Sequence, residues 1–249
     1  MELVAITALG VGGATIFGAL IGFIFKKISH KFSDIVLSFA AGVMLAAAVF
    51  GLILPSLENN NKYRVLVTVV GIFVGGFCLN VVDKLVPHLH RLAGNDLEHH
   101  NNKSVNKVLL FVSAIAIHNL PEGIAAGVGF GSGNIANALL LAGGIALQNI
   151  PEGMIIIAPM LAAGISARKT FIIAAITGAI EVLGTFIGYF AINVATSILP
   201  FALSFAGGVM LYVVSDEMIP ETHHNHSPGV TYSFLVGFCV MLISDFLLG

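Results

Sequence analysis

Three carboxylates interrupt long apolar stretches of this sequence. Glu122, Glu152 and Glu181 each lie in a segment of more than twenty residues that carries no other charged residue apart from one histidine, His118. A charge at the centre of a membrane helix costs at least about 2.5 kcal/mol on insertion scales, so acids placed there are expected to serve a function. A structural, hydrogen-bonded role for each acid is the alternative.

The residues beside two of these acids are metal-binding types. His118 precedes Glu122 by four positions, and Gln148 precedes Glu152 by the same spacing, so each pair shares a helix face. Imidazole and carboxylate together suit zinc and similar metals. Three neighbouring carboxylates repel one another, and a dication relieves that repulsion. An asparagine stands one position along, at the edge of each face: Asn119 and Asn149.

A second group of metal-binding residues follows a later apolar stretch, in the segment SDEMIPETHHNH. Asp216, Glu217, Glu221 and His223 are predicted to form a release or waiting site at the inner mouth of the pathway. A solvated helix end with no metal is the alternative.

Membrane-spanning helices are needed to position these residues. The chain has 249 residues, 57% hydrophobic and only 10% charged, whereas soluble domains carry about 25% charged residues. We therefore predict an all-α polytopic membrane protein with one transmembrane domain over residues 1–249. Its net charge of −2 does not indicate a nucleic-acid partner. Eight spans are predicted from apolar runs long enough to cross a bilayer: 3–25, 35–57, 65–89, 108–131, 135–163, 170–196, 197–221 and 230–248.

The positive residues predict the orientation. Nine of the eleven lysines and arginines fall in loops or span ends on one side of the predicted membrane, and that side is expected to be the cytoplasm. Both termini are then outside, and no basic segment precedes the first span as in a cleaved signal peptide. Eight of the nine histidines share the cytoplasmic side, several in a loop near 90–107, and short histidine-rich tracts suggest metal contact.

Two internal repeats predict the topology. FAAGVML (39–45) returns as FAGGVML (205–211), and IHNLPEG (117–123) returns as LQNIPEG (147–153). The copies lie in predicted spans of opposite direction, which indicates three helices, a central pair, and three inverted helices. Inverted repeats with proline-interrupted central helices are typical of secondary transporters that bind substrate near the midplane. Helix packing through small residues could explain the first repeat alone.

These motifs resemble the ZIP (Zrt/Irt-like) metal transporter family, and its bacterial branch most closely. The resemblance rests on HNLPEG, on NIPEG, on the lone glutamate in EVLG, and on DEMIPE, and it covers essentially the whole chain. It implies a 3+2+3 helical arrangement, a homodimer, an elevator-like motion, and uptake of Zn²⁺, with tolerance for Fe²⁺, Mn²⁺ or Cd²⁺, into the cytoplasm across the bacterial cell membrane.

The resemblance also implies a ligand set. The first metal would be bound by His118, Glu122, Gln148 and Glu152. Asn119, Asn149 and Glu181 would complete a second site that shares the glutamates. Many members carry histidine at the position of Gln148 and some carry aspartate at that of Asn149, so both positions are weaker ligands here. The metal is cargo, and no resident cofactor is expected.

Three other functions are less consistent with the sequence. A gated divalent-cation channel needs no alternating access, whereas the inverted repeats favour a carrier. An intramembrane metalloprotease often holds zinc through HExxH, which this sequence lacks; we expect no enzymatic activity. A receptor that senses cytoplasmic zinc through its histidines has no need of midplane glutamates.

Overall fold

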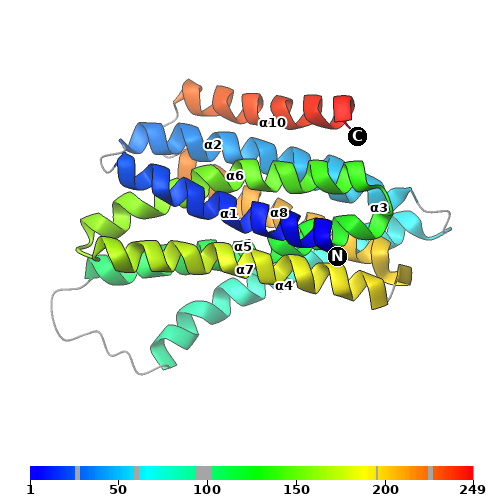
Figure 1. Cartoon of the computed structure of the whole chain (residues 1–249), viewed down its shortest axis with the longest axis horizontal. Coiled ribbons are helices and arrows are strands. Elements are labelled where there is room, and N and C mark those ends of the chain that lie inside the picture. Colours follow the sequence, from blue (N-terminus) through cyan, green and yellow to red (C-terminus); the bar gives the residue numbers. More distant parts are fainter. Residues whose placement is uncertain (26–28, 59–61, 93–102, 195, 224–226, 249) are drawn as a thin grey trace.

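The computed structural model describes residues 1–25, 29–58, 62–92, 103–194, 196–223 and 227–248. These residues form helices throughout, as the apolar runs predict (Figure 1). The α-helices are α1 (Glu2–Ile24), α2 (His30–Ala46), α3 (Leu54–Leu57), α4 (Arg64–Leu92), α5 (Lys103–Gly129), α6 (Ile135–Ala162), α7 (Ala167–Val194), α8 (Leu199–Val213), α9 (Ile219–Thr222) and α10 (Pro228–Leu248). Two π-helical segments, η1 (Ala47–Ile53) and η4 (Val214–Met218), and two 3₁₀ turns, η2 (Phe130–Ser132) and η3 (Thr196–Ile198), join them.

Seven stretches of the described chain are long and apolar enough to cross a membrane, which confirms the prediction of multiple spans. Two of them are composite: α2, η1 and α3 form one stretch, and α8, η4 and α9 form another. The stretches are Glu2–Ile24, His30–Leu57, Arg64–Leu85, Ile135–Ala162, Ala167–Val194, Leu199–Thr222 and Pro228–Leu247.

The remaining predicted span, 108–131, corresponds to α5, which has 27 residues. Helix α4 ends at Leu92 and α5 begins at Lys103, so both helices extend into the predicted loop 90–107. Residues 93–102, with His99 and His100, lie outside the described part. His224 and His226 lie outside it as well.

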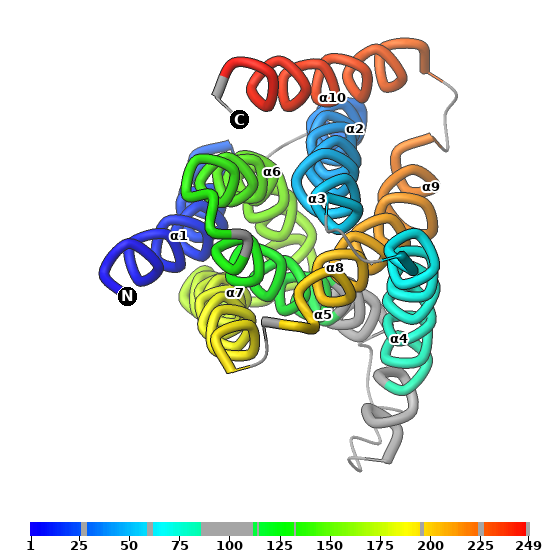
Figure 2. Tube along the Cα trace, turned by 90° about the vertical axis from the view of Figure 1, so that its right-hand side faces the viewer, coloured from blue at the N-terminus to red at the C-terminus, as the bar shows by residue number. Residues whose placement is uncertain are grey.

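The long helices lie alongside one another, and both chain ends lie toward the same end of the bundle (Figure 1). Their closest pairings are α1 with α6, α5 with α7, α4 with α8, and α2 with α10. Helix α1 also packs along α7, so α1, α5, α6 and α7 form one group. Seen from the end of the bundle, α4 and α8 lie together on one side of this group, and α2 and α10 lie together at the top (Figure 2).

Glycines of the two PEG motifs bring these helices into backbone contact. A Cβ on Gly153 would lie 2.0 Å from the carbonyl oxygen of Thr15 in α1, and one on Gly123 would lie 2.2 Å from that of Glu181 in α7. Only glycine permits so close an approach. The motifs therefore fix α6 against α1 and α5 against α7 at the level of the buried glutamates.

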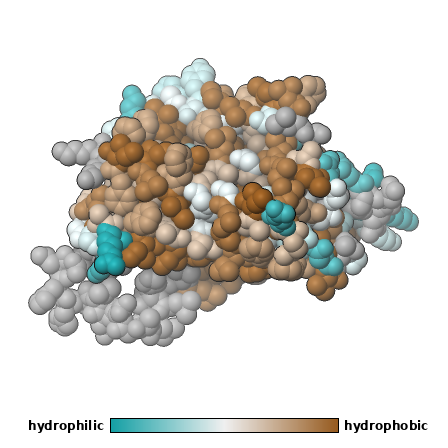
Figure 3. All heavy atoms as spheres, in the orientation of Figure 1, coloured by the Kyte–Doolittle hydropathy of each residue, from teal (hydrophilic) through white to brown (hydrophobic). Residues whose placement is uncertain are grey.

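The outer surface is apolar over the length of the helices. In Figure 3 most of the visible face is hydrophobic, and hydrophilic residues are largely found toward its ends. Large side chains such as Phe73, Phe77 and Phe246 are exposed. An apolar patch of this extent indicates a membrane-facing surface.

Candidate metal centre

Helices α5, α6 and α7 carry all seven of the predicted midplane residues into the interior of the bundle, and none is more than 6% exposed. Two of these helices contain a proline inside the sequence motif, Pro121 in α5 and Pro151 in α6. The buried set is His118, Asn119, Glu122, Gln148, Asn149, Glu152 and Glu181.

Glu181 is held by two neighbouring helices. One carboxylate oxygen accepts a hydrogen bond from the Thr15 hydroxyl of α1 (2.9 Å), and the other accepts one from the Asn149 amide of α6 (2.6 Å). The same amide nitrogen also lies 3.3 Å from the carbonyl oxygen of Val11. Since both contacts use the nitrogen, the Asn149 side-chain oxygen is left free of hydrogen bonds within the described residues. This oxygen is a candidate metal ligand.

Glu122 is buried without the partners that an acid in the interior requires. Neither of its carboxylate oxygens makes a hydrogen bond of acceptable geometry within the described chain, although the Gln148 amide lies beside it. An unsatisfied buried polar group costs about 1–3 kcal/mol, and more if it is charged.

Two buried side-chain amides of the site, those of Asn119 and Gln148, are unpaired as well in the described part of the chain. The side-chain nitrogen and oxygen of both Asn119 and Gln148 have no hydrogen-bond partner among the described residues. Buried polar groups are nearly always paired, so a group of unpaired ones needs an explanation. Carboxylate and amide oxygens together form a ligand set that a divalent cation would satisfy.

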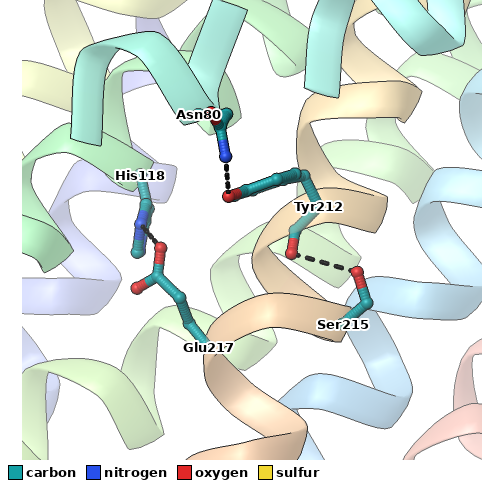
Figure 4. Close-up of polar contacts among 5 residues, drawn as sticks. All are labelled: Asn80, His118, Tyr212, Ser215 and Glu217. Atoms are coloured by element: carbon teal, nitrogen blue, oxygen red, sulfur yellow. Dashed lines mark hydrogen bonds and ion pairs between the residues drawn. The ribbon is translucent and has the colours of Figure 1, made fainter. Parts of the chain in front are cut away.

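His118 points toward a second cluster of acids. Its Nε2 lies 2.6 Å from a carboxylate oxygen of Glu217, which belongs to η4 (Figure 4). Asp83 of α4 completes the cluster, and the potential ligand atoms of these three residues lie within 4.8 Å of one another. Three protein ligands leave the fourth position of a tetrahedral zinc site to water or a substrate.

A cavity of about 290 Å³ is lined by residues of both clusters. His118 and Glu152 line it together with Asp216, Glu217 and Glu221. Three of the four predicted inner-mouth residues thus face one space, which connects to the midplane set through His118 and Glu152.

The fourth inner-mouth residue, His223, is not among the residues that line this cavity. Its Nδ1 lies 2.9 Å from the carbonyl oxygen of Ile219 and 3.0 Å from the Thr222 hydroxyl. The imidazole therefore contacts the end of its own helix, where carbonyls lack helical partners.

Two residues of the site were not predicted from the sequence. Asp83 lies within the extension of the predicted span 65–89, and an acid inside a span is the signal that identified the glutamates. Thr15 carries no such signal, because a threonine in an apolar helix is unremarkable until the facing helix is known.

Known proteins resemble this chain along its length. A family profile described as ZIP Zinc transporter matches residues 95–245. Zinc transporter GufA of Myxococcus xanthus is 36% identical over 98% of this chain and 98% of its own. Zinc transporter ZIPB of Bordetella bronchiseptica is 36% identical over 95% of this chain and 78% of its own. Zinc transporter ZupT of Chlorobaculum parvum is 35% identical over 95% of this chain and 94% of its own.

The family consists of transporters, in agreement with the expectation that the chain is not an enzyme. The profile covers more than half of the chain, including α5, α6, α7 and the segment that carries Asp216 and Glu217. By this match and by its similarity to full-length bacterial relatives, the chain belongs to the ZIP zinc transporter family.

Proposed function

We propose that this protein is a secondary transporter that takes up Zn²⁺ into the cytoplasm through a midplane site on α5, α6 and α7. The observation that carries the proposal is the set of buried, unpaired polar atoms on Asn119, Glu122, Gln148 and Asn149. In a membrane interior these groups are costly unless a cation binds among them. Fe²⁺, Mn²⁺ and Cd²⁺ are further candidate cargoes because the ligands are a mixture of nitrogen and oxygen donors.

The ligands divide into two overlapping sets in this proposal. His118, Glu122, Gln148 and Glu152 hold the first ion. Asn119, Asn149 and Glu181 complete a second site beside it, with the glutamates shared. Support for the second site comes from the Asn149 side-chain oxygen, because its amide nitrogen is occupied by Glu181 and Val11.

The ion leaves toward the cytoplasm through the cavity lined by Glu152 and Glu217. His118 contacts Glu217 directly, so an ion released by Glu122 can be taken up by the cluster of Asp83, His118 and Glu217. Asp216 and Glu221 extend the acidic lining beyond this cluster. Negatively charged side chains along a narrow path raise the local concentration of cations and guide them.

An inverted repeat of three helices about the central pair α5 and α6 is part of the proposal. Thr15 and Glu181 are separated by 166 residues and are hydrogen-bonded to each other. Gly12 and Gly178 have the same separation, and each lies against the carbonyl oxygen of the other. Reciprocal contact between equivalent positions is what a two-fold axis produces. The helix pairings repeat in the same way. Helix α1 packs on α6 as α7 packs on α5, and α2 packs on α10 as α8 packs on α4.

This arrangement favours a carrier over a gated channel. The group α1, α5, α6 and α7 is held together by backbone contacts at glycines, including Gly12, Gly123 and Gly153. Contacts between this group and the other helices pass more often through flexible side chains, as where Leu141 meets Gly51. Movement of one group past the other, in the manner of an elevator, would expose the site to each side in turn.

In the cell, we propose an eight-span protein of the bacterial cell membrane that forms homodimers, with both termini outside. The concentration of lysine and arginine on one side supports that orientation. Lipid contact follows from the exposed apolar surface.

Zinc uptake by the purified protein tests this function. Proteoliposomes that contain a zinc-sensitive dye should show saturable uptake, reduced by competing metals in order of their affinity. Glu122→Gln and Glu152→Gln should abolish uptake, whereas Glu58→Gln, at the exposed end of α3, should not. Uptake by well-inserted Glu122→Gln and Glu152→Gln proteins at the wild-type rate would refute the site. Conductance steps of many ions per opening would instead indicate the channel.

A further inference from the structure

A large apolar groove lies between the helix pairs α4–α8 and α5–α7. Its volume is about 560 Å³, twice that of the acidic cavity on the other side of α5. Every residue that lines it is apolar apart from the thiol of Cys78 on α4. The lining includes Leu120 and Ile124 of α5, Leu183 and Ile187 of α7, and Phe205 of α8.

The groove lies directly behind the metal-binding part of α5. Leu120, Pro121 and Ile124 face the groove, whereas His118 and Glu122 of the same two turns are buried among the metal ligands. The groove is therefore at the depth of the midplane site. At this depth the surroundings of the protein are hydrocarbon.

The groove lies where α4 and α5 meet only loosely. Helix α4 packs tightly along α8, and α5 packs along α7 and also on α8, but α4 touches α5 only briefly. Glycine contacts hold α4 to α8, as at Gly75, where a Cβ would lie 2.2 Å from the carbonyl oxygen of Phe205. Each pair is thus held together by backbone contacts, and the groove lies between the two pairs.

The walls of the groove are continuous with the surface that meets lipid. Leu183 is 61% exposed, and Leu120 and Ile187 are also exposed while they line the groove. Water has no place there, because a buried water needs two to four polar partners and apolar cavities stay dry. A flexible apolar chain supplied by the bilayer fits both the lining and the depth.

We propose that an acyl chain of a membrane phospholipid binds in this groove as a retained ligand, between α4–α8 and α5–α7 and against the back of the metal-binding segment of α5. The bound chain supplies the packing that α4 does not give to Leu120 and Pro121. If the two helix groups move during transport, the chain lies in the seam along which they separate.

Tryptophan fluorescence provides the test, since the chain contains no tryptophan. Phe205→Trp places the probe in the groove, and Phe73→Trp places a matched probe on the outer face of α4, where the side chain is 75% exposed. Both variants are reconstituted with phospholipid brominated along its tails, which quenches nearby tryptophan, and are then transferred into excess unbrominated lipid.

Both probes should be quenched at first. The fluorescence of Phe205→Trp should then recover about tenfold more slowly than that of Phe73→Trp. A tenfold difference corresponds to a free energy of about 1.4 kcal/mol that retains the lipid in the groove. Equal recovery rates would overturn the proposal, since lipid would then merely pass over the groove. Absence of quenching at Phe205→Trp would also overturn it, and cross-linking of two copies through Cys78 would then identify a second protein molecule as the occupant.

A second measurement uses the unsubstituted protein and avoids any effect of tryptophan on folding. Cys78 and Cys239 are both exposed, but Cys78 lines the groove, whereas Cys239 lies on α10 and is not among the lining residues. Removal of lipid by detergent should accelerate modification of Cys78 by an apolar maleimide several-fold relative to Cys239. Equal acceleration of the two thiols would contradict a bound acyl chain.

Discussion

Substitution of Thr15 by valine tests whether Glu181 is a metal ligand. The Thr15 hydroxyl is the contact through which α1 holds the Glu181 carboxylate, with an oxygen–oxygen distance of 2.9 Å and both residues fully buried. Valine keeps the shape of threonine and removes the donor. Within the part of the chain that the structure describes, the carboxylate would then keep only the Asn149 amide as a hydrogen-bond donor.

The expected effect can be estimated in two ways. A hydrogen bond to a charged group contributes about 1.5–3 kcal/mol, and about 1.4 kcal/mol corresponds to a factor of ten in an equilibrium constant. Loss of an outer-shell partner of a metal ligand lowers metal affinity about 10- to 100-fold. We therefore expect Thr15→Val to weaken zinc binding by about tenfold or more, and to raise the zinc concentration for half-maximal uptake accordingly.

Thr185→Val is a closely matched control. Thr185 is also fully buried, and its hydroxyl donates to Glu181 at 2.9 Å, but to the main-chain carbonyl oxygen rather than to the carboxylate. Zinc titration of both purified variants by calorimetry, with uptake in proteoliposomes and thermal unfolding, separates an effect on the metal from one on folding. Equal zinc affinities for Thr15→Val and Thr185→Val would refute a ligand role for Glu181.

Three further predictions follow from the packing, the exit cluster and the orientation. Gly123→Ala should destabilise the protein by about 1–3 kcal/mol, which is typical of overpacking, because the new Cβ would lie 2.2 Å from a main-chain oxygen. The control, Gly143→Ala, has open space around the new Cβ and should leave thermal unfolding unchanged. Glu217→Gln should slow zinc release more than it weakens zinc binding to the midplane site, which single-turnover uptake can distinguish; a change in binding alone would contradict the exit role. In a cysteine-free protein, Ser166→Cys should react only from the cytoplasmic side and Asn134→Cys only from outside, and the reverse pattern would overturn the orientation.

The sequence identified the glutamates because a charge in an apolar run is visible without a structure. Glu122, Glu152 and Glu181 are the acids near the centres of predicted spans. Asp83 follows an uncharged run that is already long enough to cross the bilayer, so its position in the sequence marks it as part of a span end and not as a midplane acid. Its partners Glu217 and His118 belong to other helices, and no pattern along one helix reveals such a meeting.

The inner-mouth residues show a second limit of sequence reasoning. Asp216 and Glu217 lie in a π-helical segment, where one extra residue per turn changes the direction of the side chains. A period of 3.6 residues therefore does not predict that both acids face the cavity with His118. His223 is grouped with them by proximity in the chain, and its Nδ1 lies 2.9 Å from the carbonyl oxygen of Ile219. A metal-binding role for His223 stays a prediction.

His118 links the two metal clusters of the proposed pathway. It shares a helix face with Glu122 in the midplane set, yet in this structure its Nε2 contacts Glu217 on the cytoplasmic side. An imidazole that binds an ion beside Glu217 through this nitrogen cannot use the same nitrogen for an ion beside Glu122. Transfer between the clusters therefore requires the ion to leave Glu122 as His118 engages Glu217. Such sharing lets one side chain lower the barrier between two sites while keeping either from binding zinc too tightly to release it.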